Sequence, residues 1–233
     1  KIIFLGVGFE TTAPTIGLSI LIAKREKIHN YFVLPSLKLI PPAMEALLAD
    51  NRTNIQGLIC PGHVSAIIGS EAYKFISQKY NVPCVVAGFQ PLDLAEGIFM
   101  LLKQIVSGRK AKTQNQYKRL VRPHGNPKAK KILEEVFQVS DASWRGLGVI
   151  AASGLEIRKG FAEFDAGCNF KVPRNKNYVI DKRCLCHEVI KGIILPGQCK
   201  LFAKGCTPAN PVGPCMVASE GACGIYYKNR NEE

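Results

Sequence analysis

The chain has 233 residues, a mass of 25.5 kDa and a formal net charge of +13, with 47% hydrophobic and 21% charged residues. This length allows one large domain or two smaller ones with a proper core, and the composition is typical of a globular protein rather than a disordered one. The longest apolar runs, such as 17–23, are too short to span a bilayer, and no signal-peptide pattern is present. Because the sequence opens at Lys1 without a Met, already inside a predicted strand, we expect a fragment that lacks its N-terminal part.

Much of the positive charge lies between Arg109 and Lys131. A basic segment of this kind can bind RNA, DNA or an acidic partner. It is also typical of a solvated linker and helix face in a basic protein. We favour this second interpretation, because no aromatic interleaving and no nucleic-acid motif accompanies the charges.

The first 105 residues alternate between strand and helix patterns. Apolar runs predict strands at 2–7, 31–34, 57–60 and 83–87, and helices at about 14–24, 42–48, 71–76 and 91–106. We expect the first strand to be buried on both faces, the second to end at Pro35, and Thr11 or Thr12 to cap the first helix. The short loops indicate an α/β fold, a mainly parallel sheet with helices on both faces.

Three glycine-bearing turns follow predicted strands, at 8–12, 61–65 and 88–91. In open parallel sheets, ligands bind outside the carboxyl ends of the strands, where helix N-termini also favour anions. The polar residues in these turns are Glu10, Thr11, Thr12, His63, Ser65 and Gln90. Each can serve only as a cap or a turn residue, but the convergence of three turns favours a site. Neither a phosphate-binding loop nor a dinucleotide motif is present.

The second half of the chain is less regular. We expect a polar, basic linker at 108–127, a helix at 128–137, a strand at 144–151 and a short amphipathic helix at 156–164. Beyond Asp165 the chain is rich in Gly, Pro and Cys, so it needs another source of stability, which a metal centre would provide. The predicted organisation is an α/β domain at 1–108, a basic linker with a helix and a returning strand at 109–160, and a cysteine-rich region at 161–233.

Six of the nine cysteines fall between Cys184 and Cys223. Without a secretion signal, nine cysteines indicate the reducing cytosol, where clustered thiols more often serve metal or redox chemistry than disulfides. We therefore expect a cytoplasmic protein. Four of the six follow the spacing C-x12-C-x6-C-x16-C: Cys186, Cys199, Cys206 and Cys223.

Three kinds of chemistry remain open for these thiols: an iron–sulfur cluster, structural zinc, or redox exchange. Zinc sites usually contain C-x2-C pairs, which are missing here, whereas single cysteines beside Gly or Pro favour a cluster held from several sides. Redox exchange suits the leftover pair, Cys184 and Cys215. Cys60, Cys84 and Cys168 are isolated in the sequence, and we expect Cys84 to lie in the core.

Several motifs occur together and in order: GFETTAP at 8–14, PGHVSAIIG at 61–69, AGFQPLD at 87–93, WRGLGVIAASGL at 144–155, FDA at 164–166, and the run from Cys186 through CTPANPVGPCMVASEGACGIYY. In these motifs the chain resembles the HypD family, which matures [NiFe]-hydrogenases. The resemblance covers essentially all 233 residues.

The resemblance implies a cytoplasmic scaffold of two related α/β domains and a cluster-bearing region, of which only the second α/β domain and the cluster region are expected here. Such a scaffold works with HypC, receives cyanide from HypE, and assembles a transient Fe(CN)2CO unit that passes to the hydrogenase large subunit. It implies a [4Fe-4S] cluster on Cys186, Cys199, Cys206 and Cys223. It also places the GFETT loop in a central cleft near the iron. There we assign Gly8 and Phe9 to cofactor binding, and Glu10, Thr11, Thr12 and His63 to the chemistry.

The chain departs from the family pattern in two ways. The family's N-terminal motifs, one with an iron-binding Cys and one with a Cys-x-x-Cys pair, have no counterpart, and Gln90 stands where Glu is expected. This leaves in question whether the chain alone holds Fe(CN)2CO. The alternative from another class is a zinc-stabilised nucleic-acid-binding α/β protein, which the +13 charge permits.

Overall fold

The computed structural model describes residues 1–172 and 181–230 and is an α/β structure with two sheets. It divides into two compact units. Unit 1 comprises Lys1–Glu45, Gln56–Ala142 and Ala151–Val172, and unit 2 comprises Ala46–Ile55, Ser143–Ile150 and Pro173–Glu233. Parts of the predicted cysteine-rich region, 173–180 and 231–233, lie outside the described residues. Over the described ranges, every helix is too short or too polar to cross a bilayer.

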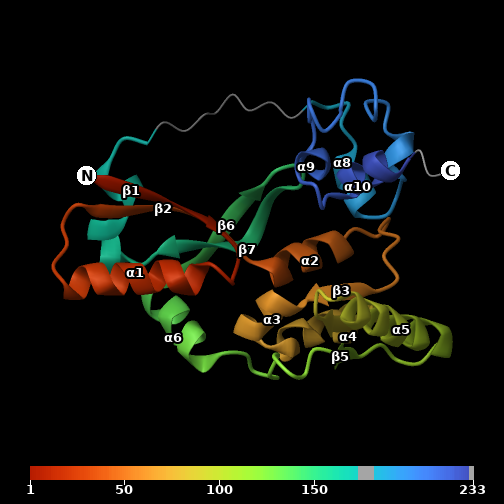
Figure 1. Ribbon diagram of the computed structural model, residues 1–233, viewed down its shortest axis with the longest axis horizontal. Helices are drawn as coiled ribbons and strands as arrows, with labels where there is room; N and C mark the ends of the chain where they lie inside the picture. Colours follow the sequence, from red (N-terminus) through yellow and green to blue (C-terminus); the bar gives the residue numbers. More distant parts are fainter. Residues whose placement is uncertain (173–180, 231–233) are drawn as a thin grey trace. The chain divides into compact units, whose positions relative to one another are not determined.

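A mixed four-stranded sheet forms one half of unit 1 (Figure 1). Its strands, in spatial order, are β1 (Ile2–Gly8), β2 (Tyr31–Lys38), β7 (Gly148–Ile157) and β6 (Phe137–Trp144). β1 and β2 run parallel, whereas β2 and β7 run antiparallel. The helices α1 (Ala13–Arg25) and α6 (Pro127–Val136) pack together, and Ile16, Ile20, Val33, Val136 and Phe137 share one buried core.

β1 differs from its predicted environment. It is an edge strand, and Ile2, Leu5 and Val7 are 60%, 64% and 64% exposed, so the expectation of burial on both faces was wrong. β2 also continues past Pro35 to Lys38. Pro35 is tolerated because β7 pairs only with Leu37 and Lys38, so the missing N–H of Pro35 interrupts no bond on that side.

A parallel three-stranded sheet forms the other half of unit 1, in the order β3 (Leu58–Pro61), β4 (Cys84–Ala87) and β5 (Thr113–Asn115). The central strand β4 is buried along its whole length, as expected for a parallel strand whose two faces are both covered by helices. Gly97 of α5 (Pro91–Ser107) packs against Ala87 on one face. Successive side chains alternate faces, so Cys84 points to the other face, where Tyr73 lies.

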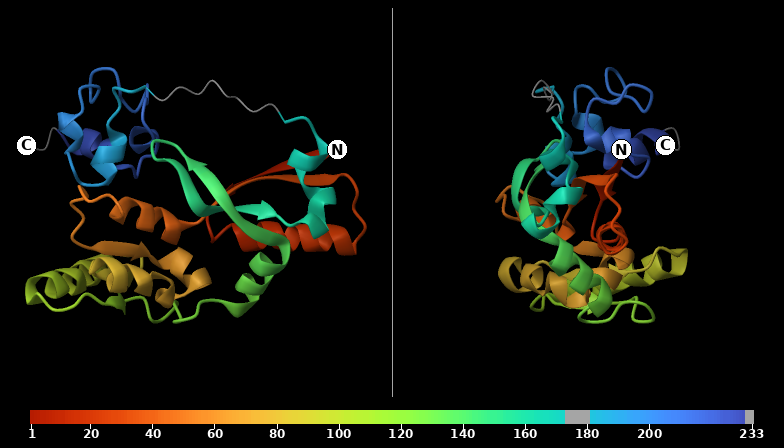
Figure 2. Two further views of the ribbon diagram at one scale, coloured as in Figure 1. Left: turned by 180° about the vertical axis from the view of Figure 1, so that it is seen from behind. Right: turned by 90° about the vertical axis from the view of Figure 1, so that its left-hand side faces the viewer.

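The remaining elements of unit 1 are α2 (Ile40–Leu48, which extends into unit 2), α3 (Gly62–Ile68), the 3-10 helix η1 (Ser70–Tyr73), α4 (Lys74–Tyr80), the 3-10 helix η2 (Lys159–Phe164) and α7 (Ala166–Asn169). Two boundaries differ from expectation. The predicted strand at 144–151 is interrupted by the turn 145–147 of the β6–β7 hairpin, with its first residue in β6 and 148–151 in β7 (Figure 2). Of the predicted helix at 156–164, the first two residues belong to β7. Residues Lys159–Phe164 form the 3-10 helix η2.

Unit 2 includes the ends of α2, β6 and β7, and its described C-terminal part, 181–230, contains α8 (Cys186–Ile190), the 3-10 helix η3 (Pro196–Gln198), α9 (Pro214–Val217) and α10 (Ala222–Asn229). Its core consists of Cys184, Cys186, Val189, Cys199, Leu201, Cys206, Cys215, Met216 and Cys223. The segment 46–55 is bound to this unit by an ion pair of 2.7 Å between Lys191 Nζ and Asp50 Oδ2. Six of the nine core residues of this unit are cysteines.

Candidate functional site

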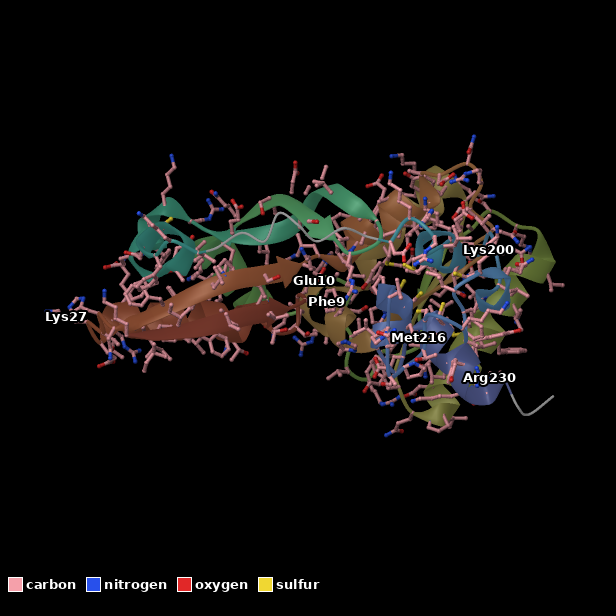
Figure 3. The ribbon with its side chains drawn as sticks, turned by 90° about the horizontal axis from the view of Figure 1, so that it is seen from above. Phe9, Glu10, Lys27, Lys200, Met216 and Arg230 are labelled. Carbon is pink, nitrogen blue, oxygen red and sulfur yellow. The ribbon has the colours of Figure 1, made fainter. Side chains whose placement is uncertain are left out.

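The GFETT loop is a tight turn between β1 and α1. Its first residue, Gly8, has φ of +150°, and a Cβ there would overlap the hydroxyl of Thr12. The carbonyl of Phe9 accepts hydrogen bonds from the N–H groups of Thr12 (3.1 Å) and Ala13 (3.2 Å). This geometry turns the chain sharply at the end of β1, where Figure 3 labels Phe9 and Glu10.

The two threonines do not cap α1 as predicted. Thr12 occupies the N-cap position, but it has helical backbone angles and makes no side-chain capping bond. Its hydroxyl instead lies over Gly8, in the space that a Cβ would need. Thr11 is half-buried.

Glu10 is the buried acid of the loop. Only 1% of the residue is exposed, and its Oε1 accepts a hydrogen bond of 2.8 Å from the backbone N–H of Ile40. Its Oε2 is buried, and no described residue provides it with a hydrogen-bond partner. Burial raises the pKa of this carboxyl from 4.5 to about 7, although the bonds from the backbone of Glu10 itself and of Ile40 oppose the shift. Glu10 can therefore hold or release a proton near neutral pH.

Glu10 lines a cavity of about 380 Å³ in unit 1. The apolar part of the wall includes Leu39, Leu133, Phe137 and Leu155. Arg158 also lines it, and its Nε donates to the backbone carbonyls of Glu134 (2.9 Å) and Phe137 (2.8 Å). Arg158 and the Ile40 N–H could not be identified from the sequence, because their roles depend on where α2, α6 and β7 meet in space.

The other two predicted turns belong to the second sheet. The turn at 61–65 follows β3 and the turn at 88–91 follows β4, whereas the GFETT loop follows β1 of the four-stranded sheet. The three turns therefore do not share one sheet edge. His63 is exposed and packs on Phe89 with ring centroids 4.7 Å apart. Across residues 1–172, no hydrogen bond links His63 to Glu10. Gln90 is the N-cap residue of α5, and its side chain makes no capping hydrogen bond.

The six C-terminal cysteines form one buried group in unit 2. The four spaced residues, Cys186, Cys199, Cys206 and Cys223, lie in the same core as Cys184 and Cys215. The Sγ atoms of Cys215 and Cys223 are 3.1 Å apart, and the Sγ of Cys206 accepts a bond of 3.4 Å from the N–H of Val212. The spacing argument separated Cys184 and Cys215 from the other four, but the fold places all six together.

Glycines make room around these sulfur atoms. Gly146 has φ of +87°, and a Cβ there would lie 3.0 Å from the Sγ of Cys186. A Cβ on Gly213 would overlap the Sγ of Cys184. Burial raises the pKa of the Cys184 thiol to about 11. The pKa of the Cys186 thiol is also raised, mainly by its hydrogen bond to Cys215 and secondly by burial. These two thiols are therefore protonated near neutral pH, and a metal centre bound there would have to displace their protons.

The donor set consists of buried thiols, which are the usual ligands of iron–sulfur clusters. Within 1–172 and 181–230, no three His, Cys, Asp or Glu side chains are placed to hold one metal ion. A four-iron cluster instead places each thiolate on a different iron, so its ligands stand farther apart than those of a zinc site. Four or more buried thiols with glycines beside them fit that chemistry.

The remaining cysteines lie in unit 1. Cys60 and Cys84, which look isolated in the sequence, stand on the adjacent strands β3 and β4 and are both fully buried. A hydrogen bond to Cys84, together with burial, raises the pKa of the Cys60 thiol. Cys84 is thus a core residue, as predicted. Cys168 is exposed on α7.

Comparison with known proteins identifies the family. The HypD profile, described as "Hydrogenase formation hypA family", matches residues 1–230. A putative hydrogenase expression/formation protein of Methanocaldococcus jannaschii is 44% identical over 230 residues, which cover 99% of this chain and 63% of that protein. The hydrogenase maturation factor HypD of Escherichia coli K12 is 41% identical over 235 residues, covering 100% of this chain and 62% of that one.

The hydrogenase maturation factor HypD of Cupriavidus necator is 41% identical over 234 residues, covering 97% of this chain and 61% of that protein. The chain thus spans a little over three fifths of the length of these curated relatives. The family profile extends from the GFETT loop through the thiol cluster, and the chain belongs to the HypD family.

Proposed function

We propose that this chain is part of a scaffold for [NiFe]-hydrogenase maturation, which assembles an Fe(CN)2CO unit and transfers it toward the hydrogenase large subunit. HypC-like and HypE-like proteins are its proposed partners. The observation that carries the proposal is the buried group of six thiols in a chain of the HypD family. The activity of the whole protein is part of the proposal, since the chain spans 61–63% of its relatives.

The proposed resident cofactor is a [4Fe-4S] cluster held by Cys186, Cys199, Cys206 and Cys223. When bound, it would supply electrons one at a time. Cys184 and Cys215 would remain as thiols in the same core, where a dithiol can give or accept two electrons. Their burial excludes water from the sulfur atoms and protects them from adventitious oxidation.

The proposed role of the GFETT loop is to contact the iron cargo or the surface of a partner. Gly8 and Phe9 shape the turn, and Thr12 closes over Gly8. Burial raises the pKa of Glu10 to about 7, so its protonated and ionised forms are both populated near neutral pH. The protonated acid can donate a hydrogen bond to an anionic ligand such as cyanide, and the ionised form can accept one. His63 would act on a separate surface, beside Phe89.

Metal and sulfide analysis of anaerobically purified protein tests the cluster. We expect about four iron and four sulfide per chain. Cys199→Ser should lose the visible absorbance of the cluster and most of the iron. Cys84→Ser, which alters a buried thiol of unit 1, should retain both. One zinc per chain, without sulfide, would instead support the zinc-stabilised nucleic-acid-binding alternative.

A further inference from the structure

The cavity that Glu10 lines, called the Glu10 cavity below, lies wholly within unit 1. Its volume of about 380 Å³ is in the usual range of small-molecule sites, and an engineered cavity of only about 150 Å³ holds benzene. The inner wall is buried, since Glu10, Phe137 and Leu155 are 1%, 2% and 8% exposed. Glu134 and Arg158, which also line the cavity, are exposed. The cavity thus leads from charged residues in water to a buried acid.

The backbone of the wall is already hydrogen-bonded. The N–H of Leu39 donates to the carbonyl of Ser153 (2.9 Å). The N–H of Arg158 donates to the carbonyl of Val136 (2.9 Å). Among the described residues that line the cavity, Glu10 is the one whose buried side-chain oxygen, Oε2, has no partner. A buried acceptor in this state costs free energy, which a donor on a bound molecule would recover.

The wall selects a neutral and largely apolar ligand. Leu133, Phe137 and Leu155 would replace the hydration shell of an ion with hydrocarbon, at a cost that one hydrogen bond does not offset. An aromatic body, in contrast, gains free energy when it leaves water for these side chains.

The polar group of the ligand has to match both forms of Glu10. Because burial raises the pKa of Glu10 to about 7, the carboxyl is present near neutral pH as an acceptor and as a donor. A hydroxyl group can donate to the ionised form and accept from the protonated one. An amine or an ether satisfies only one of the two forms well.

We propose that the Glu10 cavity binds a small neutral aromatic alcohol, with its rings against Leu133, Phe137 and Leu155 and its hydroxyl on the Oε2 of Glu10. A body of two fused rings suits the volume, which is more than twice the size that holds one ring. The site needs no residue of unit 2, so it does not rest on the thiol core or on the proposed maturation role.

Calorimetric titration of the full chain with 2-naphthol tests the proposal. 2-Methylnaphthalene is the matched probe, because it has the same shape without the hydroxyl. We expect 2-naphthol to bind about tenfold more tightly, since it alone provides a partner for Oε2. In Glu10→Leu, which removes that oxygen, the two probes should bind with equal affinity. The comparison in the wild type does not depend on this variant.

Two further measurements locate the probe. Ala72→Phe should fill the cavity and abolish binding of 2-naphthol, because Ala72 lines it from η1. Ala162→Phe is the control: Ala162 is also a half-buried alanine in a 3-10 helix of unit 1, but it does not line the cavity. Circular dichroism checks the folding of both variants. In the wild type, the methyl NMR resonances of Leu133 and Leu155 should shift during the titration.

The outcomes are distinct. Equal affinity of the wild type for the two probes would show that Oε2 makes no bond to the ligand and would overturn the proposal. A wild-type chain that binds neither probe would do the same. Retained binding in folded Ala72→Phe, or lost binding in folded Ala162→Phe, would place the probe elsewhere and likewise overturn it. Iron and sulfide content is measured separately, so failure here leaves the test of the cluster unaffected.

Discussion

At the residue scale, Glu10 connects the sequence motif to a measurable property. The carboxyl is buried and has one hydrogen-bonded and one unpartnered oxygen. Removing a carboxylate from water disfavours its charged form, so the folded chain keeps the proton to higher pH than the unfolded chain. The same burial that makes Glu10 a candidate proton donor therefore makes the folded state sensitive to pH.

Glu10→Gln should remove a pH dependence of stability. The folded pKa of Glu10 is raised from 4.5 to about 7, so its contribution to stability is fully present below pH 4.5 and is lost as pH rises through 7. The loss is about 3 kcal/mol at most. We expect the free energy of unfolding of the wild type, relative to Glu10→Gln, to fall between pH 4.5 and pH 7.5 in denaturant titrations followed by circular dichroism.

Glu163→Gln provides the control, because Glu163 is exposed. Its pH profile should follow that of the wild type. A Glu10→Gln profile parallel to that of the wild type across this range would show that Glu10 ionises normally and would refute its proposed role in holding a proton.

Gly8→Ala should destabilise the GFETT turn by about 1–3 kcal/mol, because φ of +150° disfavours a side chain and the new Cβ would overlap the Thr12 hydroxyl. Adding Thr12→Ala removes the overlap with the hydroxyl, but the Cβ of residue 12 still lies 2.9 Å from the new Cβ and the backbone strain remains, so the double variant should recover part of the loss. The measurement is the midpoint of thermal unfolding. Equal midpoints for the single variant and the wild type would mean that the turn tolerates a side chain.

At the element scale, α5 is held to the following segment by a buried acid. Asp93 is 4% exposed, and its carboxylate accepts bonds from Arg119 (2.7 and 2.5 Å) and Gln116 (2.9 Å). These bonds, Arg119 first, lower the pKa of Asp93 to about 2. The loop that follows β5 is thereby fastened to the start of the helix.

Asp93→Asn should lower the thermal midpoint at pH 7, because the charge that binds Arg119 is lost. Because the pKa of Asp93 is lowered in the folded chain, its contribution to stability is present above about pH 4 and is lost as pH falls through about 2. The difference in thermal midpoint between Asp93→Asn and the wild type should therefore shrink over that interval. Thermal melts at pH 7, 4 and 2.5 measure it. A difference independent of pH would indicate lost packing rather than lost charge.

The sequence predicted most elements but not their grouping into two sheets. Periodicity located α1 and α5, and apolar runs located β3 and β4, because those segments are determined by local pattern. β5 was hidden in a polar segment, since Thr113–Asn115 is strand only through its pairing with β4. Partly exposed short strands of this kind carry a weak local signal.

The site was predictable in composition and unpredictable in geometry. The GFETT residues and the four spaced cysteines are visible in the sequence, but the burial of Glu10 depends on Ile40, which is 30 residues away. The inclusion of Cys184 and Cys215 in the thiol core likewise depends on turns that no spacing rule describes. Contacts between distant segments decide both features.

At the scale of the whole molecule, the two units are stabilised by different means. Unit 1 has two sheets and helices over a hydrocarbon core. Within 181–230, the helices of unit 2 are three to eight residues long, and six of the nine residues in its core cluster are cysteines. Segments so short are marginal without tertiary support, and a bound metal centre can supply that support directly.

Removal of the metal should therefore unfold unit 2 and spare unit 1. After anaerobic chelation of iron, we expect amide hydrogen exchange to rise sharply in α8, α9 and α10, while the amides of β4 keep their protection. The reason is that the apolar core around β4 contains no proposed ligand, whereas four of the nine core residues of unit 2 are proposed ligands. Cys199→Ser should reproduce the exchange pattern of the chelated protein, and Cys84→Ser should reproduce that of the loaded protein. Undiminished protection in α8 to α10 after iron loss would show that unit 2 folds without its metal, and loss of protection in β4 as well would show that the two units unfold together.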